Sequence, residues 1–329
     1  MSSGAALADD ALLALPTVFR DGLFSARTVL VSGAGTGIGR AIACLFGRLG
    51  ASLVLCGRER EKLERTAALL ARIGTTGLVV PTNIREPDRV DALFEAIAAR
   101  GLDLDVVVNN AGGQYPQASI DLSDKGWRAV VDTNLNGTFT MMQRAARFWR
   151  RADERGQASA APPALSDAPA PGRAVVPGRA VVRGEAVAPG GCGARPDRSI
   201  VNIVAPYRRG MHGLAHTIAA RAGVAHRAQS LAVEWAPDGI RINCVLPGPI
   251  ATEGLAVYSD AARAGLARGN PLRRLGDVQD VAEACVYLSA ASGKFITGEV
   301  LVVDGGHQHW GELWMAGRPA RWPEAEPEA

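Results

Sequence analysis

Residues 28–39 read Thr28-Val29-Leu30-Val31-Ser32-Gly33-Ala34-Gly35-Thr36-Gly37-Ile38-Gly39. The run starts as an apolar, β-branched segment typical of a buried strand and passes into a glycine-rich turn. Residues 40–49 continue with helical periodicity. In a strand, turn and helix of this kind, glycines let the backbone approach a pyrophosphate at the positive end of the helix. The stretch therefore predicts the dinucleotide-binding unit of an α/β fold.

The same alternation continues along the chain. Seven apolar runs have strand length, at residues 28–32, 52–55, 77–80, 104–108, 199–203, 241–245 and 299–303. Helical patterns lie between them, at residues 40–49, 59–72, 86–100, 126–150 and 216–235. Nearly continuous apolar strands that alternate with helices indicate a parallel sheet covered on both faces. We expect a doubly wound parallel sheet in a single α/β domain.

The composition divides the chain into a domain and its attachments. We expect an N-terminal leader over 1–20, the domain over 21–306 and a C-terminal tail over 307–329. An Ala/Pro/Gly/Arg-rich insertion over 152–198 interrupts the domain, and within it 171–176 recurs as 177–182. So few copies cannot bury a core, so the insertion is expected to be disordered and without catalytic meaning. A lid or a partner-binding segment is the alternative.

Charge and composition exclude several partners. The net charge is +3 with no Lys/Arg block, which argues against a nucleic-acid partner. No stretch reaches the ~18 continuous apolar residues that span a bilayer, and the N-terminus lacks the order of a secretory signal. Five cysteines are scattered without disulfide or metal spacing, namely Cys44, Cys56, Cys192, Cys244 and Cys285. We expect a cytoplasmic protein without a metal site.

Several motifs together resemble those of short-chain dehydrogenases, a family with the Rossmann fold. The spacing of Gly33, Gly37 and Gly39 is similar to the family's Gly-x-x-x-Gly-x-Gly. The motifs Asn109-Asn110-Ala111-Gly112, Asn134-Leu135-Asn136-Gly137 and Pro247-Gly248-Pro249-Ile250 follow in the family's order. The resemblance implies a nicotinamide dinucleotide held by Gly33, Gly35, Thr36, Gly37, Ile38, Gly39, Asn83, Asn110, Ala111, Gly112, Arg221, Pro247, Gly248, Ile250 and Thr252.

The residue after the second strand predicts which dinucleotide binds. An enzyme that uses NAD carries an acidic residue there for the ribose 2′-hydroxyl, whereas this chain has Cys56-Gly57-Arg58. A guanidinium can grip the 2′-phosphate of NADP with two hydrogen bonds. We therefore expect NADP(H), although Arg58 is alternatively only the first residue of a solvated helix.

The family's usual catalytic pair is replaced. Aligned on its Tyr-x-x-x-Lys motif, the chain has Thr217 at the tyrosine position and Arg221 at the lysine position. The serine position falls on Val204 or Ala205, and Asn134 alone survives of the usual four. A threonine hydroxyl has far too high a pKa for the proton transfer that a phenol performs. Ordinary carbonyl reduction through Thr217 is therefore disfavoured.

Residues 216–224 resemble instead the peroxisomal-type trans-2-enoyl-CoA reductases and 2,4-dienoyl-CoA reductases of the superfamily. Reduction of a C=C bond conjugated to a thioester builds negative charge on the thioester oxygen, which needs hydrogen-bond donors more than a proton shuttle. We expect Tyr207 and Asn134 to face this enolate oxygen. Thr217 would orient the substrate, and Arg221 would hold the nicotinamide ribose in place of lysine. The resemblance implies an acyl-CoA substrate and a homotetramer.

Other interpretations stay open at this point. Tyr207, next to Arg208 and Arg209, is alternatively an exposed loop residue. Arginines that could meet the phosphates of coenzyme A are Arg208, Arg209, Arg263, Arg268, Arg273 and Arg274. The chain also resembles alcohol or aldehyde dehydrogenases of citronellol and citronellal. A protein that binds NADPH as a sensor or scaffold, without chemistry, is the third possibility.

Overall fold

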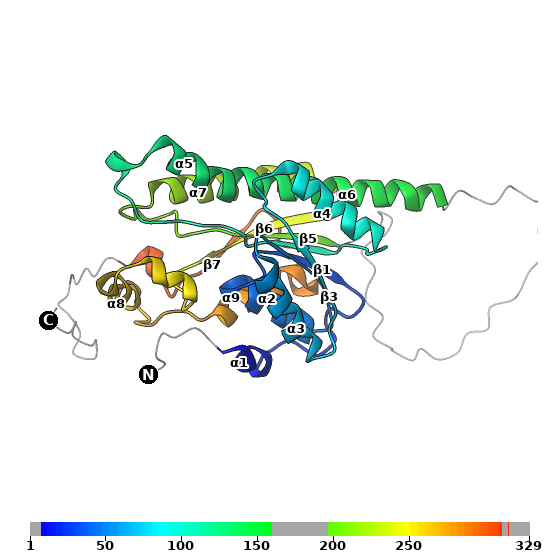
Figure 1. The fold of residues 1–329 in the computed structure, drawn as a ribbon, viewed down its shortest axis with the longest axis horizontal. Coiled ribbons are helices and arrows are strands. Elements are labelled where there is room, and N and C mark those ends of the chain that lie inside the picture. Colours follow the sequence, from blue (N-terminus) through cyan, green and yellow to red (C-terminus); the bar gives the residue numbers. More distant parts are fainter. Residues whose placement is uncertain (1–7, 160–196, 311–314, 316–329) are drawn as a thin grey trace, which may run out of the picture.

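The computed structural model describes residues 8–159, 197–310 and 315. Its centre is a seven-stranded, all-parallel sheet with the order β3-β2-β1-β4-β5-β6-β7 (Figure 1). The strands are β1 (Thr28–Ser32), β2 (Ser52–Gly57), β3 (Gly77–Pro81), β4 (Val106–Asn109), β5 (Arg198–Ile203), β6 (Ile240–Pro247) and β7 (Val300–Val303). All seven predicted strands are present, and the predicted doubly wound sheet is confirmed.

Helices cover both faces of this sheet. The main ones are α2 (Gly37–Arg48), α3 (Arg60–Ala71), α4 (Pro87–Ala99), α5 (Asp124–Val131), α6 (Thr138–Ser159), α7 (Ala215–Glu234) and α9 (Val278–Ser289). In Figure 1 the helices α4, α5, α6 and α7 lie above the sheet, and α2, α3 and α9 lie below it. The sheet is therefore the middle of three layers.

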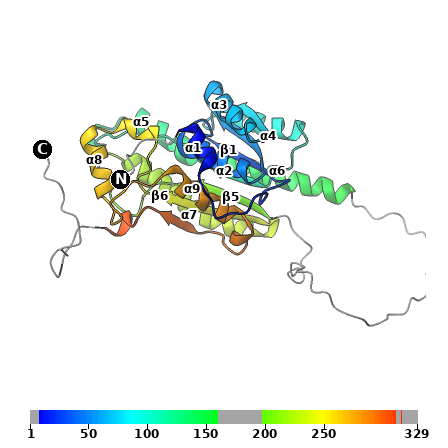
Figure 2. The same ribbon diagram turned by 90° about the horizontal axis from the view of Figure 1, so that it is seen from below.

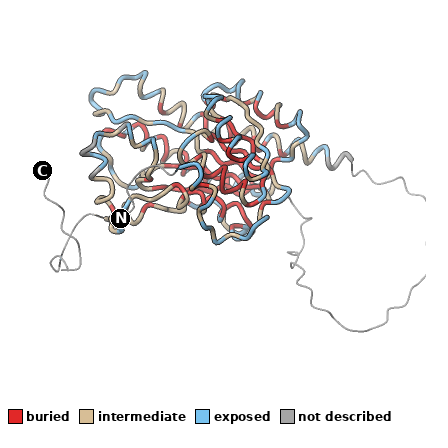
Figure 3. Tube along the Cα trace, turned by 60° about the horizontal axis from the view of Figure 1, so that its bottom comes forward, coloured by how far each residue is buried: buried red, intermediate tan, exposed pale blue. Residues whose placement is uncertain are grey.

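Alternation along the strands sends side chains into two separate cores. Val29 and Val31 of β1 join the cluster under α2 and α9, whereas Leu30 between them joins the cluster under α4, α6 and α7. Both faces of the central strands are buried, as Figure 3 shows in red. Burial of both faces explains why these strands read as continuous apolar runs.

Some elements differ from the sequence prediction. The helix expected over 126–150 is interrupted by a π-helical turn at Asp132–Gly137, which separates α5 from α6. Helices α8 (Asp260–Arg268) and α9 were not predicted. The N-cap of α9 is a capping box, in which the Asp277 side chain accepts from the amide of Asp280 and the Asp280 side chain accepts from the amide of Asp277. Its Asp277-x-x-Asp280 signal was therefore readable in the sequence.

The expected leader is partly built into the fold. Helix α1 (Asp9–Ala14) lies against α2, where Arg40 pairs with Asp9 at 2.6 Å and Arg48 donates to the carbonyl of Leu12. Within the described residues, no helix combines the length and the apolar character needed to cross a membrane.

The expected insertion begins later than its composition indicates. Helix α6 continues to Ser159, and residues 160–196 lie outside the described residues. Asp153 near the end of α6 accepts two hydrogen bonds, of 2.5 and 2.7 Å, from Arg198 at the start of β5. This pair joins the two elements that flank the insertion. Of the expected tail, only residues 307–310 and 315 are described.

Candidate active site

The candidate site lies at the carboxyl ends of the central strands. Strand β1 has β2 on one side and β4 on the other, so the chain winds in opposite directions from this point. Ligands of open α/β sheets bind in the crevice at such a switch point. A cavity of about 450 Å³ lies there, lined by the glycine-rich turn and by the ends of β2, β3 and β4.

The glycine-rich turn fits a dinucleotide for steric reasons. Gly33 and Gly37 have φ angles of +67° and +50°, which other residues rarely adopt. A Cβ on Gly39 would lie 2.2 Å from the carbonyl oxygen of Gly33, so only glycine lets the turn close. The Thr36 side chain does not cap α2, which leaves the first amides of this helix available to an anion. The cavity therefore suits a pyrophosphate.

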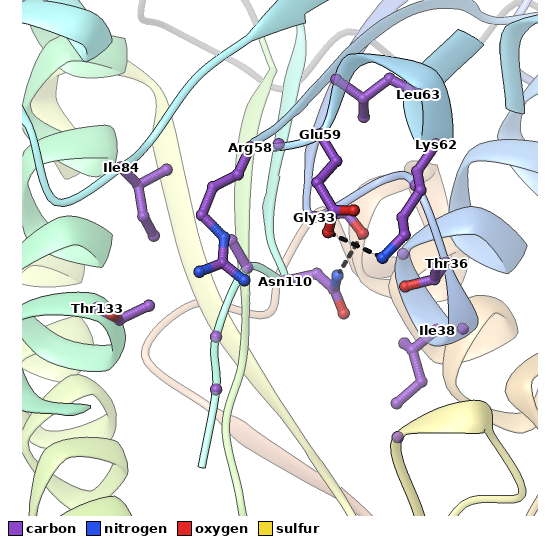
Figure 4. A pocket seen from close by; sticks show the side chains of 18 of the residues that line it. Gly33, Thr36, Ile38, Arg58, Glu59, Lys62, Leu63, Ile84, Asn110 and Thr133 are labelled. Atoms are coloured by element: carbon purple, nitrogen blue, oxygen red, sulfur yellow. Dashed lines mark hydrogen bonds and ion pairs between the residues drawn. The ribbon is translucent and has the colours of Figure 1, made fainter. Parts of the chain in front are cut away.

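Arg58 extends into this cavity from the end of β2, as Figure 4 shows. Among the described residues, no carboxylate lies within ion-pair distance of its guanidinium. Glu59, the next residue in the chain, pairs instead with Lys62 at 2.8 Å, and this hydrogen bond lowers the pKa of Glu59. Asn83 also lines the cavity and donates to Glu86. The end of β2 thus presents an unpaired cation.

A second cavity of about 440 Å³ adjoins the first. The two cavities share the lining residues Ile38, Asn110, Gly112, Gly113, Thr252 and Gly254. The second is otherwise largely apolar, with Ile203, Val204, Met211, Leu255 and Leu266 in its wall. Helices α5 and α8 lie at this same end of the sheet in both Figures 1 and 2. One cleft therefore offers a dinucleotide half and an apolar substrate half.

Asn134 lies in the π-helical turn at the floor of the second cavity. Its Nδ2 donates to the carbonyl of Gly113 at 2.8 Å, and its Oδ1 accepts from the amide of Gly113 at 3.1 Å. The side chain therefore fixes the loop after β4, and one hydrogen of Nδ2 remains for another acceptor.

Thr217 and Arg221 reach the same floor from α7. Thr217 Oγ1 and Arg221 Nη1 are buried, and neither has a hydrogen-bond partner within the described part of the chain. Burial lowers the pKa of Arg221 to about 10, which still leaves the guanidinium charged at neutral pH. Buried polar atoms without partners are uncommon and call for a ligand or a water. The floor thus holds unused donors.

The structure brings together most of the predicted site residues. Pro247, Gly248 and Ile250 line the second cavity, and Ala111 lines the first. Tyr207 is the exception among the catalytic candidates, because it does not line either cavity. Its half-buried ring packs on the core cluster beneath α7, with the guanidinium of Arg208 6.0 Å from the ring centroid. Its catalytic role stays a prediction.

Two lining residues were not predicted as site residues. Gln114 follows the Asn110–Gly113 loop, and Tyr258 follows the 3₁₀ helix at Glu253–Val257. The Gln114 amide donates to the hydroxyl of Tyr258. Gln114 lies two residues after the Asn109–Gly112 motif and Tyr258 six residues after Thr252. No spacing rule links these two residues, which are 144 positions apart.

The histidines have no metal geometry. His216 is fully buried, and its ring meets that of Tyr115 edge-on at 5.0 Å. Within the described ranges, no group of three or more His, Cys, Asp or Glu side chains could hold a metal ion. Of the arginines considered for coenzyme A, Arg209 donates to the carbonyl of His307, and Arg274 pairs with Asp280.

Known proteins are similar to this chain in sequence and in fold. The family described as short chain dehydrogenase matches residues 27–158, and the one described as enoyl-(acyl carrier protein) reductase matches residues 185–308. A probable 2,4-dienoyl-CoA reductase of Caenorhabditis elegans is 30% identical, over 94% of this chain and 91% of its own length. This chain belongs to the short-chain dehydrogenase family.

Other relatives show how broadly the family ranges. The peroxisomal 2,4-dienoyl-CoA reductase of Arabidopsis thaliana is 30% identical over 93% of this chain and 90% of its own. A solved citronellol catabolism dehydrogenase of Pseudomonas aeruginosa is 32% identical with a TM-score of 0.67, covering 89% of this chain and 100% of that chain. Family membership makes the protein an oxidoreductase that binds a nicotinamide dinucleotide.

Proposed function

We propose that the protein is an NADPH-dependent reductase of the C=C bond in a 2-enoyl-CoA thioester. The observation that carries the proposal is the charged Arg221 guanidinium beside Thr217 at the floor of an apolar cavity, with Nη1 and Thr217 Oγ1 unpartnered. When bound in the first cavity, the dinucleotide would supply a hydride to the β-carbon of the substrate. Negative charge then develops on the thioester oxygen, where preorganised donors act most strongly.

The residues present suit an enolate better than an alkoxide. Reduction of a ketone or aldehyde needs a group that delivers a proton to oxygen at neutral pH. Thr217 and Arg221 cannot do so, because the hydroxyl is too weak an acid and the guanidinium keeps its proton. Both can donate hydrogen bonds to an oxygen that becomes negative. Similarity to dienoyl-CoA reductases supports the same substrate class.

Roles for the site residues follow from their places. Arg221 Nη2 lies against Gly112, between the two cavities, and suits the predicted contact with the nicotinamide ribose. Thr217 orients the thioester, and we assign the remaining Nδ2 hydrogen of Asn134 to the enolate oxygen. For Arg58 we propose a contact with the 2′-phosphate of NADPH.

A citronellol or citronellal dehydrogenase is the second candidate. The solved citronellol catabolism dehydrogenase covers 89% of this chain at 32% identity, which favours it. The apolar wall of the second cavity would accept a terpene chain as well as an acyl chain. Substrate trials therefore have to include both.

The test is the oxidation of NADPH with trans-2-decenoyl-CoA, run beside citronellal and beside NADH. The proposal predicts rapid turnover of the enoyl-CoA with NADPH. Arg221→Met should lower kcat by about 100-fold, the loss typical of an oxyanion donor, and Arg221→Lys should recover part of it. Arg58→Ala should raise KM for NADPH while leaving KM for NADH nearly unchanged. Turnover of citronellal alone would instead establish the second candidate.

We also propose a cytoplasmic homotetramer. The four described cysteines are buried, reduced thiols, which agrees with a reducing compartment. Light scattering of the purified protein would give the mass of four chains if this is correct, and a smaller mass would reject it.

A further inference from the structure

Tyr258 and Gln114 meet at the wall of the substrate cavity. Tyr258 follows the 3₁₀ helix at Glu253–Val257, and Gln114 follows the loop after β4. Both side chains line the cavity that also contains Thr217 and Arg221. Tyr258 is the only phenol among the lining residues of this cavity within the described chain.

The direction of their hydrogen bond leaves the phenol free to donate. Gln114 Nε2 donates to Tyr258 Oη, so the oxygen accepts and its own hydrogen is available to another group. Tyr258 is half-buried, and burial raises its pKa, while the Gln114 bond lowers it in part. The phenol is therefore neutral at working pH and keeps the hydrogen that it can donate.

We propose that Tyr258 is a catalytic residue whose phenol donates a hydrogen bond to the carbonyl oxygen of the bound thioester. The inference rests on the proposed function. As the hydride and its two electrons add to the β-carbon, the C=C electron pair moves to the α-carbon–carbonyl bond and the carbonyl pair moves to oxygen. Tyr258 stabilises that oxygen without losing its proton, and water then supplies the proton that adds to the α-carbon.

The neighbouring contacts tie the phenol to the dinucleotide half. Thr252, six residues before Tyr258, lines both cavities. Glu253 next to it pairs with Arg40 of α2 at 3.1 Å. Helix α2 begins at the glycine-rich turn, so the segment that carries Tyr258 is anchored to the element that would bind the pyrophosphate. The segment that carries the phenol therefore contacts both the cofactor cavity and α2.

Tyr258→Phe tests the donor, and Tyr287→Phe is its matched comparison, because Tyr287 is exposed on α9 and lines neither cavity. The inference predicts that Tyr258→Phe lowers kcat with trans-2-decenoyl-CoA by about 100-fold, with little change in KM, since the bond strengthens in the transition state. Tyr287→Phe should keep nearly all of the wild-type kcat. A Tyr258→Phe variant with the kcat of Tyr287→Phe would overturn the inference. Binding of NADPH, followed by fluorescence, checks that each variant is folded.

Two changes at Gln114 separate a donor from a structural latch. Gln114→Leu removes the bond between the two side chains but keeps the phenol, so most of kcat should remain. Gln114→Glu places an acceptor beside the phenol and draws its hydrogen away from the substrate, so the loss should approach that of Tyr258→Phe. If Gln114→Leu lowers kcat as much as Tyr258→Phe does, the tyrosine acts only through its hydrogen bond to Gln114, and the inference is wrong.

The outcomes also separate this inference from the proposed function. If the wild type turns over enoyl-CoA and Tyr258→Phe is equally active, the catalytic role of Tyr258 is rejected and the proposed function stands. If the wild type binds NADPH but none of the enoyl-CoA substrates causes NADPH oxidation, the proposed function is rejected, and with it the role of Tyr258.

Discussion

Gly112 and Arg221 are fitted to each other at the junction of the two cavities. A Cβ on Gly112 would lie 2.0 Å from Arg221 Nη2 and 2.7 Å from Asn134 Oδ1. Space for the guanidinium therefore depends on the absence of a side chain at position 112. Gly112 was predicted from its motif to bind the cofactor, whereas its contact with Arg221 joins residues 109 positions apart and was not predicted.

Gly112→Ala is accordingly expected to displace Arg221 and to lower kcat/KM by at least about 10-fold, because misplaced catalytic groups lose rate steeply. Gly113→Ala is the control, since nothing lies within 4 Å of a Cβ there. Steady-state kinetics of the two variants decide the matter. If Gly112→Ala has the same kcat/KM as Gly113→Ala, the reaction does not depend on the position of the Arg221 guanidinium.

Single residues were predictable where a motif carried them. Arg58 was found because it follows a strand by a known spacing, and the structure places it in the first cavity. Asn134 was found in the same way, but its bonds to the backbone of Gly113 were not foreseeable. Gln114 and Tyr258 come together only through the fold.

At the scale of elements, Asp105 joins the starts of two strands. It directly precedes β4, and its Oδ2 accepts from the amide of Thr28 at 2.8 Å. Desolvation by burial raises the pKa of this carboxyl. A raised folded-state pKa means that the folded state favours the protonated form, so the ionised carboxylate destabilises the fold once the pH exceeds that pKa.

Asp105→Asn should therefore raise Tm at neutral pH, because the amide oxygen can still accept from Thr28 and no charge is buried. The gain should shrink as the pH falls through the raised pKa of the wild-type carboxyl, because protonation removes the buried charge. Thermal melts over a pH series measure this difference. Asp103→Asn is the exposed control and should change Tm little at any pH.

Arg198 fastens α6 to β5. Its side chain is 7% exposed, pairs with Asp153 and lies 5.7 Å from the ring centroid of Trp149. Arg198→Ala is expected to lower the free energy of unfolding by about 1–3 kcal/mol, because it leaves a partly buried carboxylate unpaired. Denaturant titration measures the change. The more exposed Arg150–Asp238 pair is the comparison. Arg150→Ala should lower the free energy of unfolding by less than about 1 kcal/mol.

Elements were predictable where their periodicity was strong. The strands are nearly correct because both of their faces are buried. The π-helical turn at Asp132–Gly137 was missed because it keeps the helical pattern and changes only the hydrogen bonding. The end of α6 was missed because its polar last turns resemble the sequence that follows.

At the scale of the whole molecule, the order of the strands creates the site. The chain winds outward in two directions from β1 and β4, which leaves a crevice at their carboxyl ends. Both cavities lie in this crevice, so the sequence predicted the place of the dinucleotide once the fold was known. The unpartnered donors Thr217 Oγ1 and Arg221 Nη1 depend on packing between distant elements, which the sequence does not show. The proposal of C=C reduction over carbonyl reduction rests on these donors.

The proposed function requires that hydride goes to a carbon–carbon double bond and not to a carbonyl group. Reaction with NADPH deuterated on the transferred position and trans-2-decenoyl-CoA, followed by mass spectrometry of the product, tests it most directly. The account predicts saturated decanoyl-CoA with one deuterium on the β-carbon. An allylic alcohol or aldehyde with deuterium on the former carbonyl carbon would show that hydride goes to the carbonyl group instead.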